Sequence, residues 1–412
     1  MKVLFLSQIV PYPPHGGVLQ RGFNLVRELG RRAEVHLLAF VHPDALPTPA
    51  TLGESRRVLG QFCASVEYFP LWPKRSTVHT ATALALGLLS RQPFSVIAHR
   101  SSAFDRAVRR ARAGESFDIV HVDTIALTPF VDLGASRPVP AALTHHNIES
   151  LLMQRRSEVE SRAAARWFLG REAGKLRDYE AAVSPHYDVN IFMSAPDRDL
   201  LMSRVSELRA AVVPNGVDLD YFAPDEAGGS ESALIYTGGM NMFANRDAVM
   251  SFLAEVWPAV TAAVPHVRFY AVGMDPPREL TALAERDPRI VVTGYVDDIR
   301  PLVRTAAVYV VPLRVGGGTR LKVLDAMASG KAIVSTAIGC EGLDVVPGEH
   351  LLVADTPETF ALATIGLLAD PVHRRRLGAA ARARVHERYA WSVVGEHLMN
   401  AYRQAITHHA KQ

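Results

Sequence analysis

Residues 311–331 read VPLRVGGGTRLKVLDAMASGK, a pattern that predicts a buried strand, a glycine-rich turn and a helix ending at Gly330. Consecutive glycines let the backbone come close to a ligand, and a helix start directs unpaired N–H groups and the positive end of its dipole into the same space. Arg320 and Lys322 add positive charge, and Asp325 could accept hydrogen bonds from hydroxyl groups. The stretch therefore predicts a site for a diphosphate joined to a ribose, with an ordinary strand-to-helix turn and solvated basic residues as the alternative.

On both sides of this stretch, short apolar runs alternate with helical segments. The runs expected to form strands are 3–7, 35–40, 119–122, 141–143 and 189–193 in the first half, and 233–237, 267–272, 290–293, 308–312, 332–335 and 351–354 in the second. This alternation is typical of parallel sheets covered by helices on both faces. We therefore expect an α/β protein with two Rossmann-like, doubly wound domains facing across a cleft, and ligands beyond the carboxyl ends of the strands.

The length and composition agree with two domains. The chain has 412 residues, 48% hydrophobic and 21% charged, whereas one ordinary domain takes roughly 100–200 residues. We expect the first domain at 1–195 and the second at 196–388. The turn-rich segment VPNGVD at 213–218 has the character of a connection between domains.

Several classes of protein are disfavoured. Cys63 and Cys340 are the only cysteines and have no partners at zinc spacing, so neither a disulfide framework nor a structural metal site is expected. The longest apolar stretch, 81–89, is about half of the roughly 20 residues that a membrane-spanning helix needs. Residues 1–7 suit a first strand better than a signal peptide, so a cytoplasmic location is expected.

The formal net charge is +3, and the arginines concentrate at 100–112 and 155–177. These basic segments could place the protein peripherally at the inner face of an anionic membrane. A solvated helix face, with Phe104 and Val108 packed inward, is the commoner alternative. No nucleic-acid partner is expected.

Further segments with glycines and polar residues lie at the ends of the predicted strands. In chain order, they are THHNIE at 144–149, VPNGVD at 213–218 followed by Tyr221-Phe222, YTGGM at 236–240 with Asn245, and TGYVD at 293–297. Together with 311–331, their order and spacing resemble the retaining glycosyltransferases of the GT-B fold, of the family 4 or group 1 type. The resemblance implies transfer of a sugar from a nucleotide diphosphate sugar to an acceptor hydroxyl. It also implies an acceptor domain at 1–195, a donor domain at 196–388 and a terminal helix at 389–412 that crosses back to the first domain.

The resemblance implies the residues of the site as well. The catalytic residues would be His146, near the anomeric carbon, and Arg320 and Lys322, on the donor diphosphate. The donor-binding residues would be Gly16, Gly17, Gly238, Arg246, Tyr295, Val296, Gly317, Gly318, Thr319, Leu321 and Asp325. Neither a metal nor a cofactor is expected, because helix N–H groups and basic side chains would stabilise the leaving diphosphate. The leaving phosphate itself would take the acceptor's proton, so we name no protein nucleophile.

Three positions depart from the family's pattern. Many relatives carry two glutamates where this chain has Gly317 and Asp325, so a contact to sugar hydroxyls is lost while a carboxylate near the ribose is kept. Relatives also often have an arginine at the position of Gly239. Arg320 or Arg246 would then supply the missing positive charge.

Two segments of the first domain carry candidate contacts. His15-Gly16-Gly17 precedes a helix, where N–H groups meet the donor phosphate in the family, and an ordinary β-to-α turn is the alternative. The adjacent His145 and His146 can contact hydroxyls or phosphate, or carry a proton. By the resemblance, His146 is the functional one.

Two other functions remain open at this point. A nucleotide-sugar epimerase would share the two Rossmann-like halves and would change the donor sugar without an acceptor. A non-catalytic partner subunit would bind the donor without transfer. This alternative is motivated by Gly317 and Gly239, where relatives often carry a glutamate and an arginine. The acceptor stays open among polysaccharides, lipid-linked sugars and natural products, and the donor base between uridine and guanosine.

Overall fold

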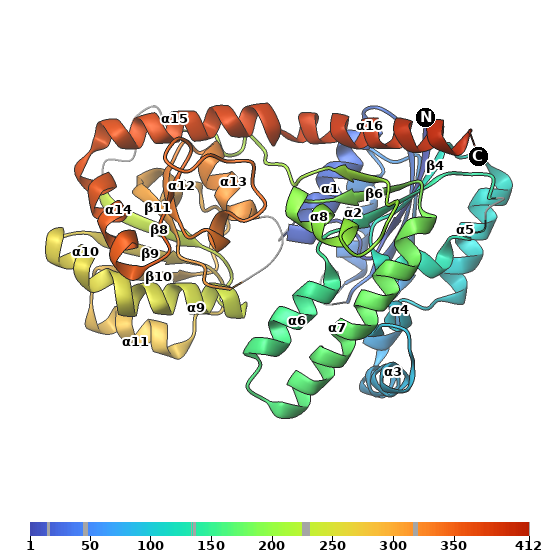
Figure 1. Cartoon of the computed structure of the whole chain (residues 1–412), viewed down its shortest axis with the longest axis horizontal. Coiled ribbons are helices and arrows are strands. Elements are labelled where there is room, and N and C mark those ends of the chain that lie inside the picture. The colour runs from blue at the N-terminus through green and yellow to red at the C-terminus, as the bar shows by residue number, and fades with distance from the viewer. Residues whose placement is uncertain are drawn as a thin grey trace. The chain divides into compact units, whose positions relative to one another are not determined.

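The computed structural model describes residues 1–14, 17–43, 48–132, 134, 137–224, 231–315 and 320–411. The chain divides into two compact units (Figure 1). Unit 1 comprises Met1–Pro214 and Val394–Gln412, and unit 2 comprises Asn215–Val393.

In the described part of unit 1, seven parallel strands form one sheet in the order β3-β2-β1-β4-β5-β6-β7. The strands are β1 (Lys2–Ser7), β2 (Glu34–Val41), β3 (Ser65–Pro70), β4 (Ile119–Val122), β5 (Ala141–His145), β6 (Val189–Phe192) and β7 (Ala210–Val212). The helices are α1 (Gly17–Gly30), α2 (Pro49–Leu59), α3 (Thr77–Leu89), α4 (Phe94–Ala98), α5 (Ser102–Gly114), α6 (Glu149–Val159), α7 (Ala163–Val183) and α8 (Ala195–Met202). The central strands are buried, as near-continuous apolar runs in a parallel sheet require.

In the described part of unit 2, six parallel strands form a second sheet in the order β10-β9-β8-β11-β12-β13. The strands are β8 (Glu231–Thr237), β9 (Arg268–Val272), β10 (Ile290–Gly294), β11 (Ala306–Val311), β12 (Ala332–Ser335) and β13 (Leu352–Val353). The helices are α9 (Phe243–Ser251), α10 (Trp257–Ala263), α11 (Arg278–Arg286), α12 (Arg300–Thr305), α13 (Leu321–Ala328), α14 (Pro357–Ala369) and α15 (Pro371–Arg388). One continuous apolar core joins the sheet to its helices.

The structure confirms the α/β class and every predicted strand, and it adds two. The added strands, β3 and β7, lie at the two edges of the first sheet, where their residues are mostly half-buried. An edge strand covered on fewer sides needs fewer apolar residues, which explains why neither forms a conspicuous apolar run.

The boundary between the units differs from the predicted one. The chain leaves unit 1 after Pro214, inside the predicted connection 213–218 and not at residue 195. The reason is that α8 and β7 complete the first sheet, with β7 pairing to β6. The last helix, α16 (Trp391–His409), begins in unit 2, and its residues from Val394 onward group with unit 1.

Candidate functional site

Both sheets reverse their strand order at the same topological place. β1 lies between β2 and β4, and β8 lies between β9 and β11. In open parallel sheets, ligands bind beyond the carboxyl ends of the strands at this switch point. The side chains that follow these strands are therefore the first candidates in each unit.

In unit 2, Lys322 is the centre of a polar cluster beyond β8. Its ammonium Nζ donates hydrogen bonds to the Tyr236 hydroxyl at 2.6 Å and to Asn245 Oδ1 at 2.7 Å, and it lies 4.1 Å from the centre of the Tyr236 ring. Tyr236 is the second-to-last residue of β8. Asn245 lies in the first turn of α9, and Lys322 lies in the first turn of α13. Three segments far apart in the sequence therefore position one lysine, and its hydrogen-bond partners are neutral.

The electrostatics of this cluster favour an anionic ligand. Burial, together with the nearby guanidinium of Arg320, lowers the pKa of Lys322 to about 7. Burial raises the pKa of Asp325 to about 7, and Lys322 opposes that rise. The buried Oδ1 of Asp325 has no hydrogen-bond partner among the described residues. An anion with adjacent hydroxyl groups would balance the positive charge of Lys322 and donate hydrogen bonds to the Asp325 carboxylate. A diphosphate linked to a ribose is such an anion.

Arg320 lies next to this cluster and is held at the start of α13. Its Nε donates to the carbonyl oxygen of Ile338 at 3.1 Å, and its Nη2 lies 3.8 Å from Glu341 Oε2. By contrast, Arg314 forms ion pairs with Asp247 and Glu255. Of these two arginines, Arg320 is the one whose charge acts on Lys322.

Gly238 brings the backbone against the same cluster. A Cβ atom at this position would lie 2.7 Å from Lys322 Nζ and 2.9 Å from Asn245 Nδ2, closer than real Cβ atoms come. Asn245 Nδ2 in turn donates to the carbonyl oxygen of Gly239 at 2.8 Å. The loop after β8 therefore requires a glycine for this close approach.

The remaining predicted donor residues have varied positions. The side chain of Arg246 is exposed on α9, Tyr295 is 61% exposed after β10, and Val296 and Leu321 are half-buried. Gly17 opens α1. The predicted residues Gly16, Gly317, Gly318 and Thr319 lie outside the described residues.

In unit 1, the ends of β4 and β5 bring His146 to Asp123. His146 Nε2 lies 3.2 Å from Asp123 Oδ1, and both side chains are buried. Burial favours the neutral acid, but the nearby imidazoles of His146 and His121 outweigh it and hold the pKa of Asp123 below its usual value. A carboxylate in this position orients the imidazole.

Asp123 was missed in the sequence. It directly follows β4, the strand beside β1 at the switch point. A polar residue directly after such a strand was the signal that could have identified it. Tyr236 and Asn245 were noticed only as parts of motifs, because their contact with Lys322 depends on the folding of three distant segments.

The two adjacent histidines have different surroundings. His145 is buried against Phe192 in a stacked arrangement, with ring centres 4.8 Å apart, and its Nε2 lies 3.0 Å from Asn190 Oδ1. Burial lowers the pKa of His145 to about 4. His145 is therefore a neutral core histidine, and His146 is the one that pairs with a carboxylate.

A second layer of buried groups supports Asp123. His121 Nε2 lies 3.8 Å from Asp123 Oδ1, and His121 Nδ1 lies 2.7 Å from the hydroxyl of Tyr402 on α16. The buried guanidinium of Arg21 donates to the carbonyl oxygens of Pro214 at 2.7 Å and Val213 at 2.9 Å. The terminal helix is thus part of the network behind His146.

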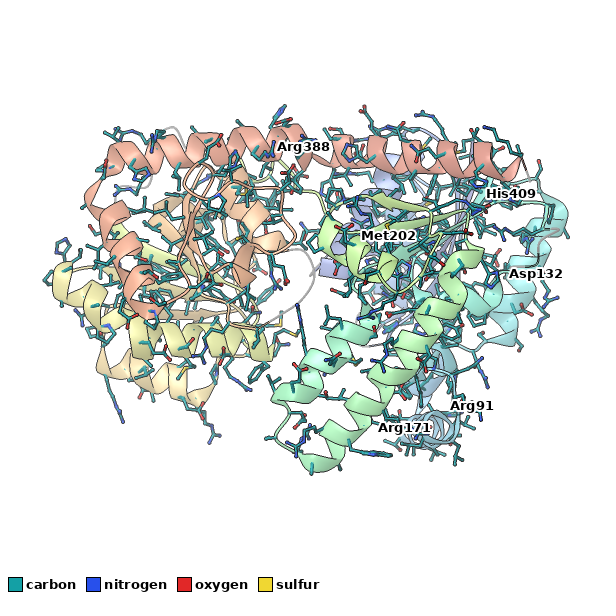
Figure 2. The ribbon with its side chains drawn as sticks, viewed as in Figure 1. Arg91, Asp132, Arg171, Met202, Arg388 and His409 are labelled. Carbon is teal, nitrogen blue, oxygen red and sulfur yellow. The ribbon has the colours of Figure 1, made fainter. Side chains whose placement is uncertain are left out.

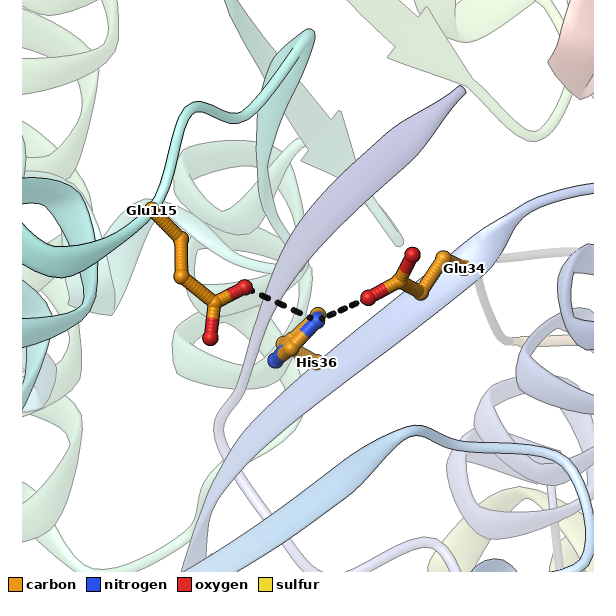
Figure 3. Close-up of side chains that lie close together, drawn as sticks. All are labelled: Glu34, His36 and Glu115. Atoms are coloured by element: carbon orange, nitrogen blue, oxygen red, sulfur yellow. Dashed lines mark hydrogen bonds and ion pairs between the residues drawn. The ribbon is translucent and has the colours of Figure 1, made fainter.

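One cluster of possible metal ligands lies elsewhere in unit 1 (Figure 3). His36 Nε2 is 3.0 Å from Glu34 Oε1 and 3.4 Å from Glu115 Oε2. The ammonium of Lys2 contacts the same two carboxylates at 3.2 and 2.5 Å. Lys2 and Glu34 open β1 and β2, so the cluster lies at the amino ends of the strands, away from the switch point. Because the ammonium of Lys2 already balances the negative charge of both carboxylates, we assign this cluster as a structural ion-pair network and not as a metal site.

The chain matches known proteins over both units. Residues 15–221 match the family model described as Glycosyltransferase Family 4, and residues 231–370 match the model described as Glycosyl transferases group 1. A phosphatidyl-myo-inositol mannosyltransferase of Mycobacterium tuberculosis is 30% identical over 215 residues, which are 49% of this chain and 56% of that protein. The chain thus spans about half the length of the curated relatives it matches.

Solved structures resemble the whole chain. A sucrose-phosphate synthase from Thermosynechococcus elongatus has a TM-score of 0.71 at 19% identity, covering 99% of this chain and 100% of its own. Anabaena HepE, solved in complex with UDP, has a TM-score of 0.65 at 16% identity, covering 97% and 99%. At these identities the structures establish a common fold. Because the first family model covers half of the chain, the protein belongs to glycosyltransferase family 4.

Proposed function

We propose that the protein transfers a sugar from a nucleotide diphosphate sugar to an acceptor hydroxyl. The observation that carries the proposal is the cluster around Lys322, where a buried carboxylate and a lysine with neutral partners lie at the switch point of unit 2. Further support comes from the family and from HepE, whose structure contains UDP.

In this proposal, the leaving diphosphate is stabilised by charges of the chain itself. Lys322 and Arg320 lie at the start of α13, whose first N–H groups and dipole also favour an anion. We therefore propose that transfer needs no metal. Asp325 would bind the ribose hydroxyls. Gly17, Gly238, Arg246, Tyr295, Val296 and Leu321, with Gly16, Gly317, Gly318 and Thr319, remain the proposed donor contacts.

We also propose retention of configuration, on the resemblance to retaining relatives. The acceptor hydroxyl would attack on the face that the phosphate leaves, and the leaving phosphate would take its proton. The pair of His146 and Asp123 would bind hydroxyls near the reacting carbon, with the carboxylate fixing the imidazole. The mannosyltransferase relative acts, by its name, on phosphatidyl-myo-inositol, which favours a lipid-linked acceptor over a polysaccharide or natural product.

The first test is thermal stabilisation by nucleoside diphosphates and nucleotide sugars, because a ligand that binds the folded state raises the melting temperature. We expect stabilisation by a uridine or guanosine diphosphate sugar that is lost in Lys322→Met and kept in Lys411→Met, a matched change at an exposed lysine. The stabilising donor is then incubated with chelator and candidate acceptors. Transfer of the sugar under these conditions supports the whole proposal.

Other outcomes would replace it. A change of the donor sugar without an acceptor would identify an epimerase. Donor binding without transfer to any acceptor class would identify a non-catalytic subunit. If the donor stabilises wild type and Lys322→Met equally, the donor does not bind at the start of α13.

A further inference from the structure

Helix α3 (Thr77–Leu89) exposes five large apolar side chains to solvent. Its buried residues are only Ala83 and Gly87. The exposed apolar side chains are Val78 at 71%, Leu84 at 41%, Leu86 at 43%, Leu88 at 40% and Leu89 at 86%. The helix contains no Asp, Glu, Lys or Arg, and its exposed polar residues are His79 and three threonines in its first half, Thr77, Thr80 and Thr82. A helix with this many apolar side chains normally buries them in a core or in lipid, whereas α3 packs along one narrow stripe.

The distribution of these side chains around the helix indicates what covers them. At 100° per residue, the five exposed residues spread over about 200° of the circumference, and the two buried residues lie on the opposite side. A flat protein surface covers one stripe of a helix, whereas acyl chains can surround more than half of it. The spread therefore favours lipid over a folded partner.

Unit 1 holds this helix firmly in its exposed position. Lys175 Nζ donates to the carbonyl oxygen of Gly87 at 2.7 Å, and Arg171 Nη2 donates to that of Leu88 at 2.9 Å. Both cations come from α7 and satisfy carbonyl groups at the end of α3, where positive charge complements the helix dipole. The exposure is thus built into the fold.

Neighbouring residues extend the apolar surface and place positive charge beside it. Trp167 on α7 is 61% exposed, and the Arg171 guanidinium lies 5.8 Å from the centre of its ring. Figure 2 labels Arg91 and Arg171 close to α3. Residues 68–104 include four Lys or Arg and no Asp or Glu. Exposed tryptophan beside basic residues is typical of a membrane–water interface.

The basic helix considered in the sequence, 100–112, is a weaker candidate. It forms α5, and its apolar residues Phe104 and Val108 are fully buried in the core of unit 1, which confirms the alternative of an inward-packed face. In the described part of the chain, no helix is long and apolar enough to cross a bilayer. A contact with lipid would have to be interfacial.

We propose that α3 and Trp167 form a docking surface for an anionic lipid bilayer, with α3 lying in the plane of the interface. The α3 docking surface comprises Val78, Leu84, Leu86, Leu88, Leu89 and Trp167. The role that we give to this surface, bringing the enzyme to a lipid-linked acceptor, rests on the proposed function. Binding to the bilayer itself requires neither donor nor turnover.

The test is co-sedimentation of the full chain with vesicles of equal parts phosphatidylglycerol and phosphatidylcholine, and with vesicles of phosphatidylcholine alone. We expect sedimentation with the anionic vesicles. The double variant Val78→Ser/Leu89→Ser removes the two most exposed apolar side chains and should weaken binding by about tenfold or more. The matched control is Leu362→Ser/Val372→Ser in unit 2, where the same residue types are 70% and 66% exposed, and it should bind as wild type does.

A second measurement follows Trp167, the most exposed of the four tryptophans. Brominated phosphatidylcholine in the anionic vesicles should quench its fluorescence, and Trp167→Phe should lose that quenching. Donor stabilisation without vesicles should be equal in all variants, so a failure of the donor site and a failure of this surface are distinguishable. The proposal is overturned if wild type does not sediment, if both vesicle types bind it equally, or if the double variant binds as wild type. It is also overturned if α3 instead mediates a dimer, detected by sedimentation velocity and lost in the double variant.

Discussion

Donor affinity should depend on pH through the charge of Lys322. In the ligand-free protein the pKa of this lysine is lowered to about 7 by burial and by Arg320, so the ammonium is half-deprotonated near neutral pH. Diphosphate oxygens beside Nζ would restore the pKa towards its ordinary value, because they stabilise the protonated form. Binding then takes up a proton above pH 7, and affinity must fall as the pH rises.

The magnitude follows from this linkage. With a pKa of about 7 in the free state and a fully protonated lysine in the complex, affinity should fall by about thirtyfold, or ~2 kcal/mol, between about pH 6 and pH 8.5. The assay is calorimetric titration with a nucleotide diphosphate sugar. A nucleotide sugar is preferable to a free nucleoside diphosphate, whose terminal phosphate itself titrates near pH 6.

Two variants isolate the effect. Lys322→Arg keeps the positive charge but does not titrate in this range, so its affinity should be independent of pH even if it is weaker. Asp325→Asn removes a carboxylate that raises the pKa of Lys322, so the fall in affinity should persist and begin at a lower pH than in wild type. A flat pH profile for wild type, or an unchanged slope in Lys322→Arg, would refute the assignment of Lys322 to the diphosphate.

Three further predictions concern the two units separately. Asp123→Asn should lower kcat by about tenfold to a hundredfold because His146 loses its anionic partner, while donor affinity in titration calorimetry stays unchanged; equal kcat would contradict the role of the pair. Gly238→Ala should weaken donor binding by about tenfold, since its methyl group would lie 2.7 Å from the lysine ammonium, and wild-type affinity would show that the loop tolerates a side chain. Tyr402→Phe should lower the free energy of unfolding by about 1–2 kcal/mol in urea titration through loss of the hydrogen bond to His121, and an unchanged midpoint would contradict that contribution.

The interior of both sheets and the edges of the second were predictable, whereas the edges of the first sheet and the unit boundary were not. Central parallel strands such as β4 and β11 are buried on both faces and form apolar runs that stand out in the sequence. The three residues of β7 gain their strand structure from pairing with β6, which no local pattern reports. The predicted boundary at 195 was wrong for the same reason, because β7 belongs to the first sheet.

The candidate site divides in a similar way. Lys322 and Asp325 were found because a short motif places them one turn apart on the same helix. The partner of His146 was not found because Asp123 precedes it by more than twenty residues and meets it only where neighbouring strands end together. A rule that inspects the residue after each switch-point strand would have named Asp123.

The division of unit 1 into two segments has a consequence for synthesis on the ribosome. Residues 394–412 belong to unit 1, yet they are translated after the whole of unit 2. The hydroxyl of Tyr402 reaches His121 across 281 positions of the chain, and Leu398, Tyr402 and Ala405 on the same helix are buried. Unit 2 is contiguous and can fold as soon as it emerges, whereas unit 1 must wait with the side chains that pack against this helix uncovered. The emerging nascent chain therefore completes its second unit before its first, and a chaperone should be needed most during that interval.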